Sequence, residues 1–574
     1  MFTVDELLDN HYPSLQRRPL IGPAARMALR HLLHEKDFVD FAKTHPHLRS
    51  FEFIEEVLSY FNFSYTVKHQ QRENIPPTGR LVMISNHPLG SLDALALLHL
   101  VGEIRRDVRI VANQMLMQLN PLHDLLLPVD NMRGNTPEGQ LNAIEQHLDS
   151  DGAVIIFPAG EVSRLGPRGV ADGRWHTGFL RMAQNTHSPV LPIHADARNS
   201  ALFYGTATLS STAATALLVR EMFKQTGRQI RFTVGERIPF HAYADMPLSL
   251  REKTLLFKRH LYRVGRDKSG VFATECGIAL PEPKSDLKRE LEACEQIGET
   301  ADGKAIYLYQ HHGPSTIMRE IGRLREVAFR AVGEGSGKRR DIDRYDQYYR
   351  HLVLWDRDEL EIVGAYRLMP TQEAVEQHGL SGLYSASLFH FDEQMQPYLE
   401  QGLELGRSFV QPRYWGKRSL DYLWYGIGAY LSRHPDIRYL FGPVSITQNM
   451  PEMGKDLLVY FYQLYFAPES KSPARHRQPF QVPESSRLEL EALFDGQDYA
   501  ADFKRLKAVM SNMGTAVPTL YKQYTELCQP GGVSFLDFGI DPEFADCIDG
   551  LVLVDSHAIK PKKYKRYIGS HSDS

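Results

Sequence analysis

Four short apolar runs, separated by turns and helix-prone segments, constrain the fold of this chain more than any other feature. In chain order they are Leu81 to Ile84, Arg109 to Ala112, Ala153 to Phe157 and Val190 to His194. Runs of strand length that alternate with helical patterns are typical of α/β folds. The sequence therefore predicts an α/β fold for this part of the chain.

A second α/β domain is expected beyond residue 285. The chain has 574 residues, which is more than one hydrophobic core usually covers. A charged, helix-prone stretch that begins at Pro281 separates the first region from a new set of elements. These are a strand at 305–309, a helix at 315–331 and strands at 351–355 and 362–368. The predicted division is a helical N-terminal segment over 1–75, one α/β domain over 76–284 and another over 285–574.

Composition and charge narrow the possible partners and compartments. Apolar residues make up 43% of the chain and charged residues 24%, as in ordinary globular proteins, and the net charge of −4 argues against nucleic acid as a partner. The four cysteines are scattered, which favours a reducing cytoplasm. The acidic N-terminus lacks the pattern of a secretory signal, and no run approaches the roughly 18 apolar residues that span a bilayer. Any work on lipids is therefore expected at the membrane surface.

The N-terminal segment offers a candidate membrane contact. Apolar residues such as Leu29, Leu32, Leu33, Phe38 and Phe41 recur at three-to-four spacing and predict helices. Arginines lie near this apolar face, at Arg17, Arg18, Arg26 and Arg30. Cationic side chains beside an apolar face suit anionic lipid headgroups. An ordinary amphipathic helix with a solvated charged side is the alternative.

The segment LVMISNHPLGSLDALALL gathers polar residues at a predicted strand-to-helix turn. Chemistry at a hydroxyl needs a base that removes the proton as the oxygen attacks, and neutral imidazole has a suitable pKa near neutrality. His87 is the candidate base. Asp93 is placed to fix its tautomer and to stabilise the imidazolium. Asn86 is placed to orient the turn and is a candidate substrate-binding residue. The alternative is a helix cap in which this pair serves only the structure.

A second motif, AVIIFPAGEVSRLG, runs from a buried strand into a loop with Pro and Gly. Such a loop exposes backbone amides, and together with an arginine it can hold an acidic headgroup or a phosphate. Glu161 can accept a hydrogen bond from a hydroxyl or an ammonium group. The candidate binding residues are Phe157, Pro158, Gly160, Glu161, Ser163 and Arg164. A plain surface turn is the alternative.

Together, NHPLGSLD and FPAGEVSR resemble the two motifs of the glycerolipid acyltransferase family, over about residues 75 to 275. In that family an HxxxxD motif supplies catalysis and an FPEGTRS motif contacts the acceptor, so the resemblance implies catalytic roles for His87 and Asp93. The chain departs from the pattern twice. Five residues rather than four separate His87 from Asp93, and Ala159 stands where the family has Glu. The chain resembles a subgroup of this family that includes enzymes that complete the synthesis of aminolipids. It resembles the phosphatidic-acid synthases less.

Charged residues in the second half follow the order of its predicted elements. Asp343 and Asp346 lie in an acidic turn between a helix and a strand, and Arg367 lies on the next strand. Acidic groups beside an open strand can hold an amine and help to remove its proton. Arg367 and Arg407 can bind a carboxylate or a phosphate. Solvated charged turns are the alternative.

This second half resembles the acyl-homoserine-lactone synthases and, more closely, the ornithine N-acyltransferases of the GNAT-like superfamily, over about residues 300 to 568. Similar segments include DRYD, VGAYRLMPT, LELGRSFVQPRYW and YLFGPVSI. The resemblance implies that Glu404 is catalytic and lies with Arg407 where donor and acceptor meet, with Asp343 and Asp346 on the acceptor side. It also implies a 3-hydroxyacyl donor on acyl carrier protein, which Arg413, Lys417 and Arg418 can contact. Another basic cluster, KPKKYKRY, begins at Lys560.

The order of the two halves resembles the bifunctional ornithine-lipid synthases. This implies that the second half N-acylates ornithine and that the first half O-acylates the resulting hydroxyl, in the cytoplasm and peripherally on the inner face of the cell membrane. No metal and no cofactor are expected, since the histidines lack HExxH or Cys/His ligand spacing. Two alternatives stay open: a lysophospholipid acyltransferase with an accessory C-terminal domain, and a non-catalytic membrane-associated scaffold. Glycine or lysine in place of ornithine also stays open.

Overall fold

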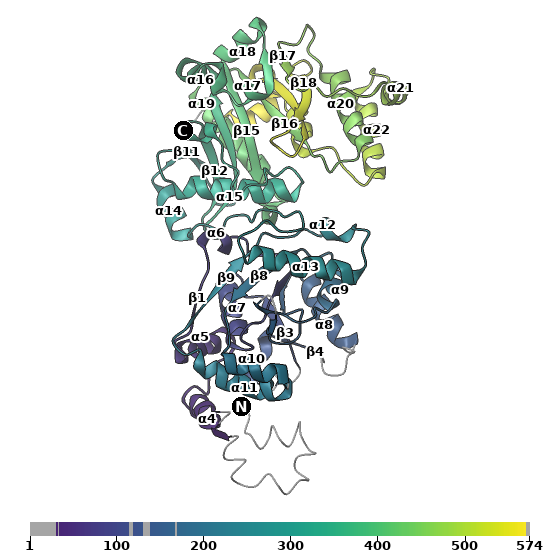
Figure 1. Cartoon of the computed structure of the whole chain (residues 1–574). Helices are drawn as coiled ribbons and strands as arrows, with labels where there is room; N and C mark the ends of the chain where they lie inside the picture. Colours follow the sequence, from purple (N-terminus) through teal and green to yellow (C-terminus); the bar gives the residue numbers. More distant parts are fainter. Residues whose placement is uncertain are drawn as a thin grey trace. The chain divides into compact units, whose positions relative to one another are not determined.

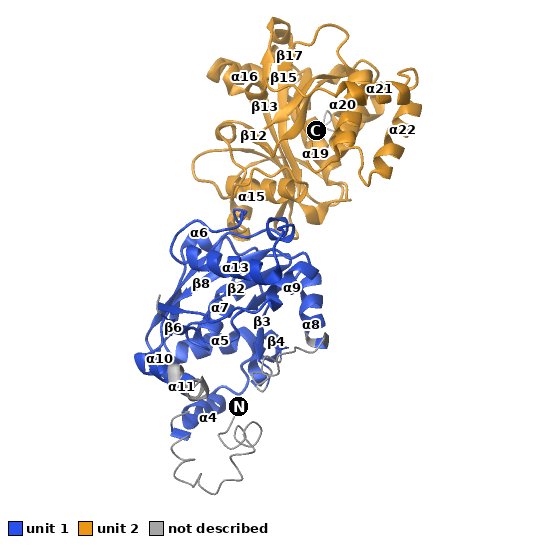
Figure 2. Ribbon diagram, turned by 45° about the vertical axis from the view of Figure 1, so that its right-hand side comes forward, with its two compact units in different colours: residues 1–277 blue, residues 278–574 orange. Residues whose placement is uncertain are grey.

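The protein is an α/β protein of two domains. The computed structural model describes residues 30, 31, 34–113, 117, 119–129, 138–166, 169–209 and 211–569. The chain divides into two compact units, with unit 1 ending at Gly277 and unit 2 beginning at Ile278 (Figures 1 and 2). This division falls a few residues before position 285. Each unit is built around its own sheet.

A seven-stranded sheet forms the centre of unit 1, in the order β1-β9-β8-β2-β5-β3-β4. Every neighbouring pair is parallel except β8 with β9. The strands are β1 (Ser64–Thr66), β2 (Leu81–Ser85), β3 (Val108–Asn113), β4 (Leu126–Val129), β5 (Ala153–Ile156), β8 (Val190–Asp196) and β9 (Gln229–Val234). The four apolar runs of the sequence are therefore confirmed as β2, β3, β5 and β8.

Helices cover both faces of this sheet because successive strand residues point to opposite sides. Leu81 and Met83 pack with α5 and α7, while Val82 and Ile84 pack with α9 and α13. The helices are α4 (Glu35–Thr44), α5 (Ser50–Tyr60), α6 (His69–Arg72), α7 (Leu92–Gly102), η2 (Asn120–Leu125), α8 (Glu138–Asp149), α9 (Gly178–Asn185), α10 (Ala201–Leu209), α11 (Ser211–Lys224), α12 (His241–Ala244) and α13 (Leu250–Val264). A small ribbon joins β6 (Arg164–Gly166) to β7 (Gly169–Ala171).

The N-terminal segment is less uniform than predicted. Its described part contains α4, α5 and α6 but also β1, which pairs with β9 at the edge of the sheet. The all-helical prediction is therefore wrong at Ser64–Thr66, where tyrosine and threonine suit a strand. The predicted membrane-contact residues Arg17, Arg18 and Arg26 lie outside the described residues. Within the described part of the chain, no helix has the length and apolar character needed to span a bilayer.

An eight-stranded sheet forms the centre of unit 2, in the order β10-β11-β12-β13-β15-β16-β19-β18. Its strands are β10 (Glu295–Glu299), β11 (Ala305–Gln310), β12 (Arg350–Asp356), β13 (Glu361–Pro370), β15 (Gly402–Val410), β16 (Tyr439–Ile446), β18 (Val533–Asp541) and β19 (Cys547–Asp555). Neighbours are antiparallel except β15 and β16. The parallel ladder stops at Glu404 and Phe441, so these two strands no longer pair beyond that point.

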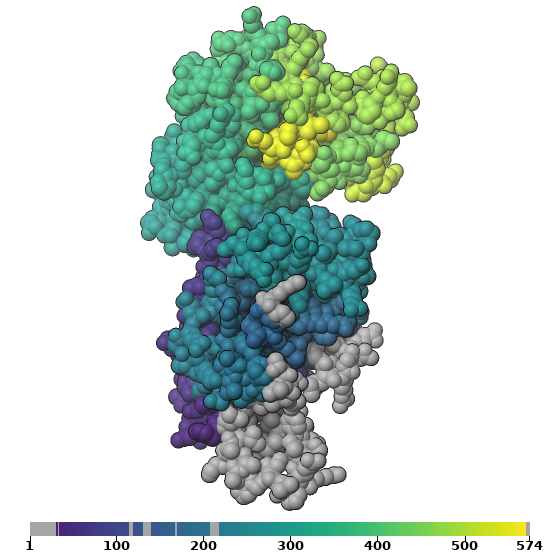
Figure 3. Space-filling model, in the orientation of Figure 1, coloured from purple at the N-terminus to yellow at the C-terminus, as the bar shows by residue number. Residues whose placement is uncertain are grey.

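Helices pack on both faces of the second sheet. One apolar cluster contains α14 and α15, and another contains α19, α20 and α22. The helices of at least seven residues are α14 (Lys284–Glu292), α15 (Thr316–Ala331), α16 (Thr371–His378), α19 (Ser419–Arg433), α20 (Glu452–Phe466), α21 (Glu484–Leu493), α22 (Tyr499–Asn512), α23 (Thr519–Thr525) and α24 (Pro561–Tyr567). The C-terminal residues, yellow in Figure 3, lie on the surface of unit 2. The predicted helix at 315–331 is confirmed as α15, with the predicted strands around it as β11, β12 and β13.

Candidate active sites

His87 and Asp93 meet on the turn between β2 and α7. Nδ1 of His87 lies 3.0 Å from Oδ2 of Asp93. The side chain of His87 is 14% exposed and that of Asp93 is 1% exposed, so the carboxylate lies behind the imidazole. Asp93 also accepts hydrogen bonds from the amides of Leu89 and Gly90, at 3.0 and 3.1 Å. These bonds fix the carboxylate and leave Nε2 of His87 for a substrate.

A glycine turn accommodates the extra residue between His87 and Asp93. Gly90 has a φ of 98°, which residues with a Cβ rarely adopt. A Cβ at this position would lie 2.9 Å from Cγ2 of Val162. The turn therefore depends on glycine both for its backbone conformation and for its close approach to the neighbouring loop.

Opposing effects set the protonation of the His87–Asp93 pair. Burial alone disfavours the imidazolium, but the charge and hydrogen bond of Asp93 outweigh it and raise the pKa of His87 above its ordinary value. Burial would also raise the pKa of Asp93, yet the charge and hydrogen bond of His87 lower it. The imidazole is therefore a stronger base than an isolated histidine, with an ionised partner beside it.

The FPAGEVSR loop packs directly against the His87 turn. The ring of Phe157 stacks on the imidazole of His87 with a centroid distance of 4.1 Å. The amide of Ser163 donates to the carbonyl oxygen of His87 at 2.8 Å. Two motifs that lie some seventy residues apart in the sequence therefore form one site.

Asp172 joins these two loops, and the sequence interpretation missed it. Its Oδ1 accepts from the Ser163 hydroxyl at 2.6 Å and from the amide of His87 at 3.3 Å. Its Oδ2 accepts from the indole of Trp175 at 2.9 Å. Asp172 is only 6% exposed. No motif marks the segment VADGRW that carries it, so only the fold shows its proximity to the catalytic turn.

Replacing Asp172 with asparagine is expected to move the pH dependence of catalysis by His87. The negative charge of Asp172 helps to raise the pKa of His87, so its removal lowers that pKa. Activity that requires neutral imidazole is lost as pH falls through the pKa, and the acid limb should therefore move to lower pH by about one unit. A pH profile of the reaction in unit 1 measures this shift. Asp196→Asn, at an exposed ion pair with Arg231, is the control, and an equal shift in both variants would contradict the expectation.

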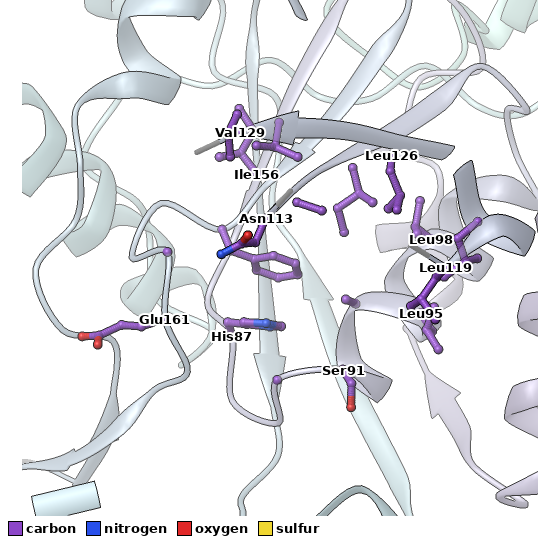
Figure 4. A pocket seen from close by; sticks show the side chains of 18 of the residues that line it. His87, Ser91, Leu95, Leu98, Asn113, Leu119, Leu126, Val129, Ile156 and Glu161 are labelled. Atoms are coloured by element: carbon purple, nitrogen blue, oxygen red, sulfur yellow. The ribbon is translucent and has the colours of Figure 1, made fainter. Parts of the chain in front are cut away.

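A large apolar cavity opens beside His87. Its volume is about 1180 Å³, which suits a long hydrocarbon chain. Its apolar walls include Phe41, Phe53, Leu95, Leu98, Leu122 and Met222. In Figure 4, Leu95, Leu98 and Leu119 gather on one side of the cavity, while His87 belongs to its lining. An acyl chain in this cavity would place its reactive end near the imidazole.

The predicted binding residues of unit 1 divide into two groups. Phe157, Pro158, Gly160 and Glu161 line the cavity. Asn86 does not line it, because its amide group pairs with the amide and carbonyl of Ala195 and ties β2 to β8. Ser163 is committed to Asp172, and Arg164 forms an exposed ion pair with Glu161 at 2.5 Å. Asn86 and Ser163 therefore hold neighbouring segments of unit 1 in position and do not line the cavity.

A buried ionic network forms the centre of the candidate site in unit 2. Nη1 of Arg325 lies 2.9 Å from Oδ1 of Asp346. Nη1 of Arg367 lies 3.1 Å from the same oxygen and 2.7 Å from Oδ1 of Asp343. Although burial opposes ionisation of Asp346, the charges of Arg325 and Arg367 hold the pKa of its carboxyl well below the usual range. The predicted Asp343, Asp346 and Arg367 are therefore brought together, with Arg325 as an additional member.

Arg407 enters the same network through a β-bulge. The pairing of β13 with β15 shifts register between Ala365 and Arg367, and Arg407 has a φ of 50°. Its Nε lies 3.2 Å from Oδ2 of Asp341, and its Nη1 donates to the hydroxyl of Tyr384 at 3.1 Å. Bulges commonly redirect a side chain at a functional site. Arg407 lies at this bulge, and its guanidinium group contacts the carboxylates of Asp341 and Asp343.

Glu404 is held by three donors. Its carboxylate accepts from the amides of Ser385 and Tyr384, at 2.6 and 3.1 Å, and from the hydroxyl of Tyr349. It is 2% exposed and lies where β15 and β16 stop pairing. Glu404 therefore lies on β15 at the last paired position of the β15–β16 ladder, and its catalytic role stays a prediction. The sequence interpretation missed Tyr349 and Tyr384, since no motif distinguishes them among the many tyrosines of this segment.

Comparison with known proteins identifies the class of each unit. An acyltransferase family model matches residues 6–267, and a GNAT acetyltransferase domain model matches residues 324–425. The protein is therefore an acyltransferase enzyme with two acyltransferase domains.

Three relatives define the family more closely. A glycine N(alpha)-acyltransferase of Bacteroides thetaiotaomicron is 32% identical over 52% of this chain and 92% of that protein. A lyso-glycine lipid O-acyltransferase of Phocaeicola vulgatus is 30% identical over 38% of this chain and 78% of that protein. An L-ornithine N(alpha)-acyltransferase of Brucella abortus is 34% identical over 25% of this chain and 60% of that protein. The chain belongs to the families of the first two enzymes, and it combines N- and O-acyltransferase domains.

Proposed function

We propose that this protein makes a diacylated aminolipid by two successive reactions. Unit 2 transfers a 3-hydroxyacyl group from acyl carrier protein to the α-amino group of ornithine. Unit 1 then transfers a second acyl group to the 3-hydroxyl of that lyso-lipid. The observation that carries this proposal is the union, in one chain, of domains whose separate relatives are named for N-acylation of an amino acid and O-acylation of the corresponding lyso-lipid.

The O-acylation follows from the geometry of His87. The lyso-lipid hydroxyl donates its proton to Nε2 of His87 while its oxygen attacks the thioester carbonyl of the acyl donor. The carbonyl reforms as the C–S bond breaks, and the thiolate takes the proton from the imidazolium. Asp93 orients the ring and stabilises its charged form throughout. The apolar cavity beside His87 supports a substrate with a long acyl chain.

The N-acylation requires a neutral amine that attacks a second thioester. Nitrogen forms the amide bond, the C–S bond breaks, and the proton lost from nitrogen balances the thiolate that leaves. The carboxylates of Asp343 and Asp346 and the guanidinium groups of Arg367 and Arg407 supply the charges for an amino acid that carries both signs. The divergence of β15 from β16 beyond Glu404 supports entry of the donor at this point.

Lipid analysis tests the two-step proposal in cells. Expression in a bacterial host that lacks aminolipids is expected to produce a phosphate-free lipid with one amide-linked and one ester-linked acyl group. Extraction and mass spectrometry identify both linkages. A changed acyl composition of the phospholipids without any aminolipid would contradict the proposal and favour a lysophospholipid acyltransferase.

A buried acidic cluster favours ornithine over glycine as the acceptor. Glu334, Asp541 and Asp549 are 8%, 2% and 4% exposed. Asp541 accepts from the hydroxyl of Tyr384, which also contacts Arg407. Burial, with the charges of Asp541 and Glu334, raises the pKa of Asp549 well above its usual range. A side-chain ammonium beside these carboxyl groups would favour their ionised form and pair with it, whereas glycine has no such group.

Substitution of Asp549 by asparagine is therefore expected to weaken the use of ornithine. Loss of one carboxylate should raise the KM for ornithine about tenfold and leave the weaker use of glycine unchanged. N-acylation assays with each amino acid measure the difference. Asp546→Asn, at an exposed position of the turn just before β19, serves as the control. An equal change of KM for both amino acids would contradict a specific role.

We propose that the protein acts at the cytoplasmic surface of the cell membrane, to which it attaches peripherally. Both products are amphipathic, and the lyso-lipid has to pass from unit 2 to unit 1 or return from the bilayer. The apolar cavity of unit 1 gives such a lipid a site outside the bilayer. Co-sedimentation of the full chain with anionic vesicles tests this placement.

A further inference from the structure

A compact basic face lies on unit 2 where α24 packs beside the start of α19. We define the basic face by Lys417, Arg418, Lys562, Lys563, Lys565 and Arg566. Three of these, Lys417, Lys562 and Lys565, are exposed and have no ion-pair partner among the described residues, while Arg418 pairs with Asp421 at 3.4 Å. The whole chain has a net charge of −4, so this local excess of positive charge is not a general property of the protein.

Asp421 holds the two parts of the basic face together. Its carboxylate contacts the guanidinium groups of Arg418 and Arg566 and accepts from the hydroxyl of Tyr567 at 2.7 Å. Gly428 of α19 allows close packing, since a Cβ there would lie 1.9 Å from the carbonyl oxygen of Tyr567. The packing of α24 against α19 therefore holds the side chains of the basic face in a defined arrangement.

The apolar side of α24 is already used within unit 2. Tyr567 and Ile568 are buried and belong to the main apolar cluster of this unit. A surface helix that binds a bilayer inserts an apolar face and adds charge attraction to it. Because α24 keeps Tyr567 and Ile568 inside the protein, its exposed side offers four basic side chains and one large hydrophobic side chain, Tyr564, which is 47% exposed. This predominance of charge favours an acidic protein over a lipid surface.

The basic face also begins a few residues after β15, the strand that carries Glu404 and Arg407. β15 carries Glu404 and Arg407 and ends at Val410, and a short connection leads to α19 at Ser419. The indole of Trp415 donates to the carbonyl oxygen of Val410 at 2.7 Å and ties this connection to the strand. A partner bound to the basic face would therefore hold its cargo near the end of β15.

We infer that the basic face docks the acidic acyl carrier protein that delivers the 3-hydroxyacyl group to unit 2. This inference rests on the proposed function. It adds the docking surface for the carrier protein, which includes α24 as well as Lys417 and Arg418. Arg413 contributes less, because it is paired with Glu359 and Glu361. Such contacts mainly control association and its salt dependence.

The test compares two double variants of the full-length protein. Lys562→Glu with Lys565→Glu reverses two charges of the basic face, and Lys504→Glu with Lys507→Glu makes the same change on the exposed side of α22. The first variant is expected to raise the KM for 3-hydroxyacyl carrier protein about tenfold and to reduce its dependence on salt. The control variant should match the unaltered protein. Both should use the same acyl group on free pantetheine equally well, which shows that unit 2 is folded and active.

Three outcomes would overturn the inference. An unchanged KM for the carrier-bound donor in the Lys562 and Lys565 variant would exclude this surface. Loss of binding to phosphatidylglycerol vesicles, with an unchanged KM for the carrier, would assign the basic face to the membrane instead. If the unaltered protein used the pantetheine thioester but not the carrier-bound donor, the donor in the proposed function would itself be wrong.

Discussion

Replacement of His87 by alanine is expected to lower O-acylation by about a hundredfold to ten-thousandfold, as for loss of a general base. N-acylation in unit 2 should continue, since its ionic network contains no residue of unit 1. The monoacylated lyso-lipid should therefore accumulate. Mass spectrometry of lipid extracts measures the ratio of lyso-lipid to diacylated lipid.

His176→Ala provides a matched control for this prediction. His176 lines the same cavity, but in the described structure no carboxylate holds its imidazole as Asp93 holds that of His87. The control should retain most of the O-acylation. Equal activity of the His87 and His176 variants would show that His87 is not the base, and loss of both products would contradict separate sites.

Asparagine at position 346 is expected to destabilise unit 2 by about 3–5 kcal/mol, the usual cost of breaking a buried ion pair. Asp346 is fully buried and shares its carboxylate between Arg325 and Arg367. Without its charge, two buried guanidinium groups lose their common partner. Amide hydrogen exchange of β12 and β13 measures the free energy of unfolding of this unit, and N-acylation should fall with it.

Asp358→Asn is the control for the Asp346 variant. It changes the same functional group on an exposed turn between β12 and β13. Its effect should stay within the small range of surface substitutions, about 0.5 kcal/mol. If the two variants had similar unfolding free energies, the buried network would contribute little to the stability of unit 2.

Features that depend on local sequence were predictable. The apolar runs of β2, β3, β5 and β8 carry their strand signal in their own residues, and the meeting of His87 with Asp93 needs only one turn. The departure in spacing was also interpretable, because Gly90 supplies the conformation that the longer turn requires.

Features that depend on distant contacts were not predictable. Asp172 accepts a hydrogen bond from the amide of His87, which lies 85 residues earlier in the chain, and nothing in its own segment indicates this contact. Ser163 is a predicted binding residue, and the sequence does not show that its hydroxyl donates to Asp172. β1 contradicts the helical prediction because its partner, β9, lies more than 160 residues further along the chain. Pairings of this kind are set by tertiary structure rather than by local propensity.

The most direct test of the whole account is a time course with the purified full-length protein, 3-hydroxyacyl carrier protein, a second acyl carrier protein thioester and labelled ornithine. We expect the amide-linked lyso-lipid to appear first and then to be converted to the diacylated lipid, and we expect the His87→Ala protein to stop at the lyso-lipid. Formation of the ester by the His87→Ala protein at the unaltered rate, or no amide product from either protein, would contradict this expectation.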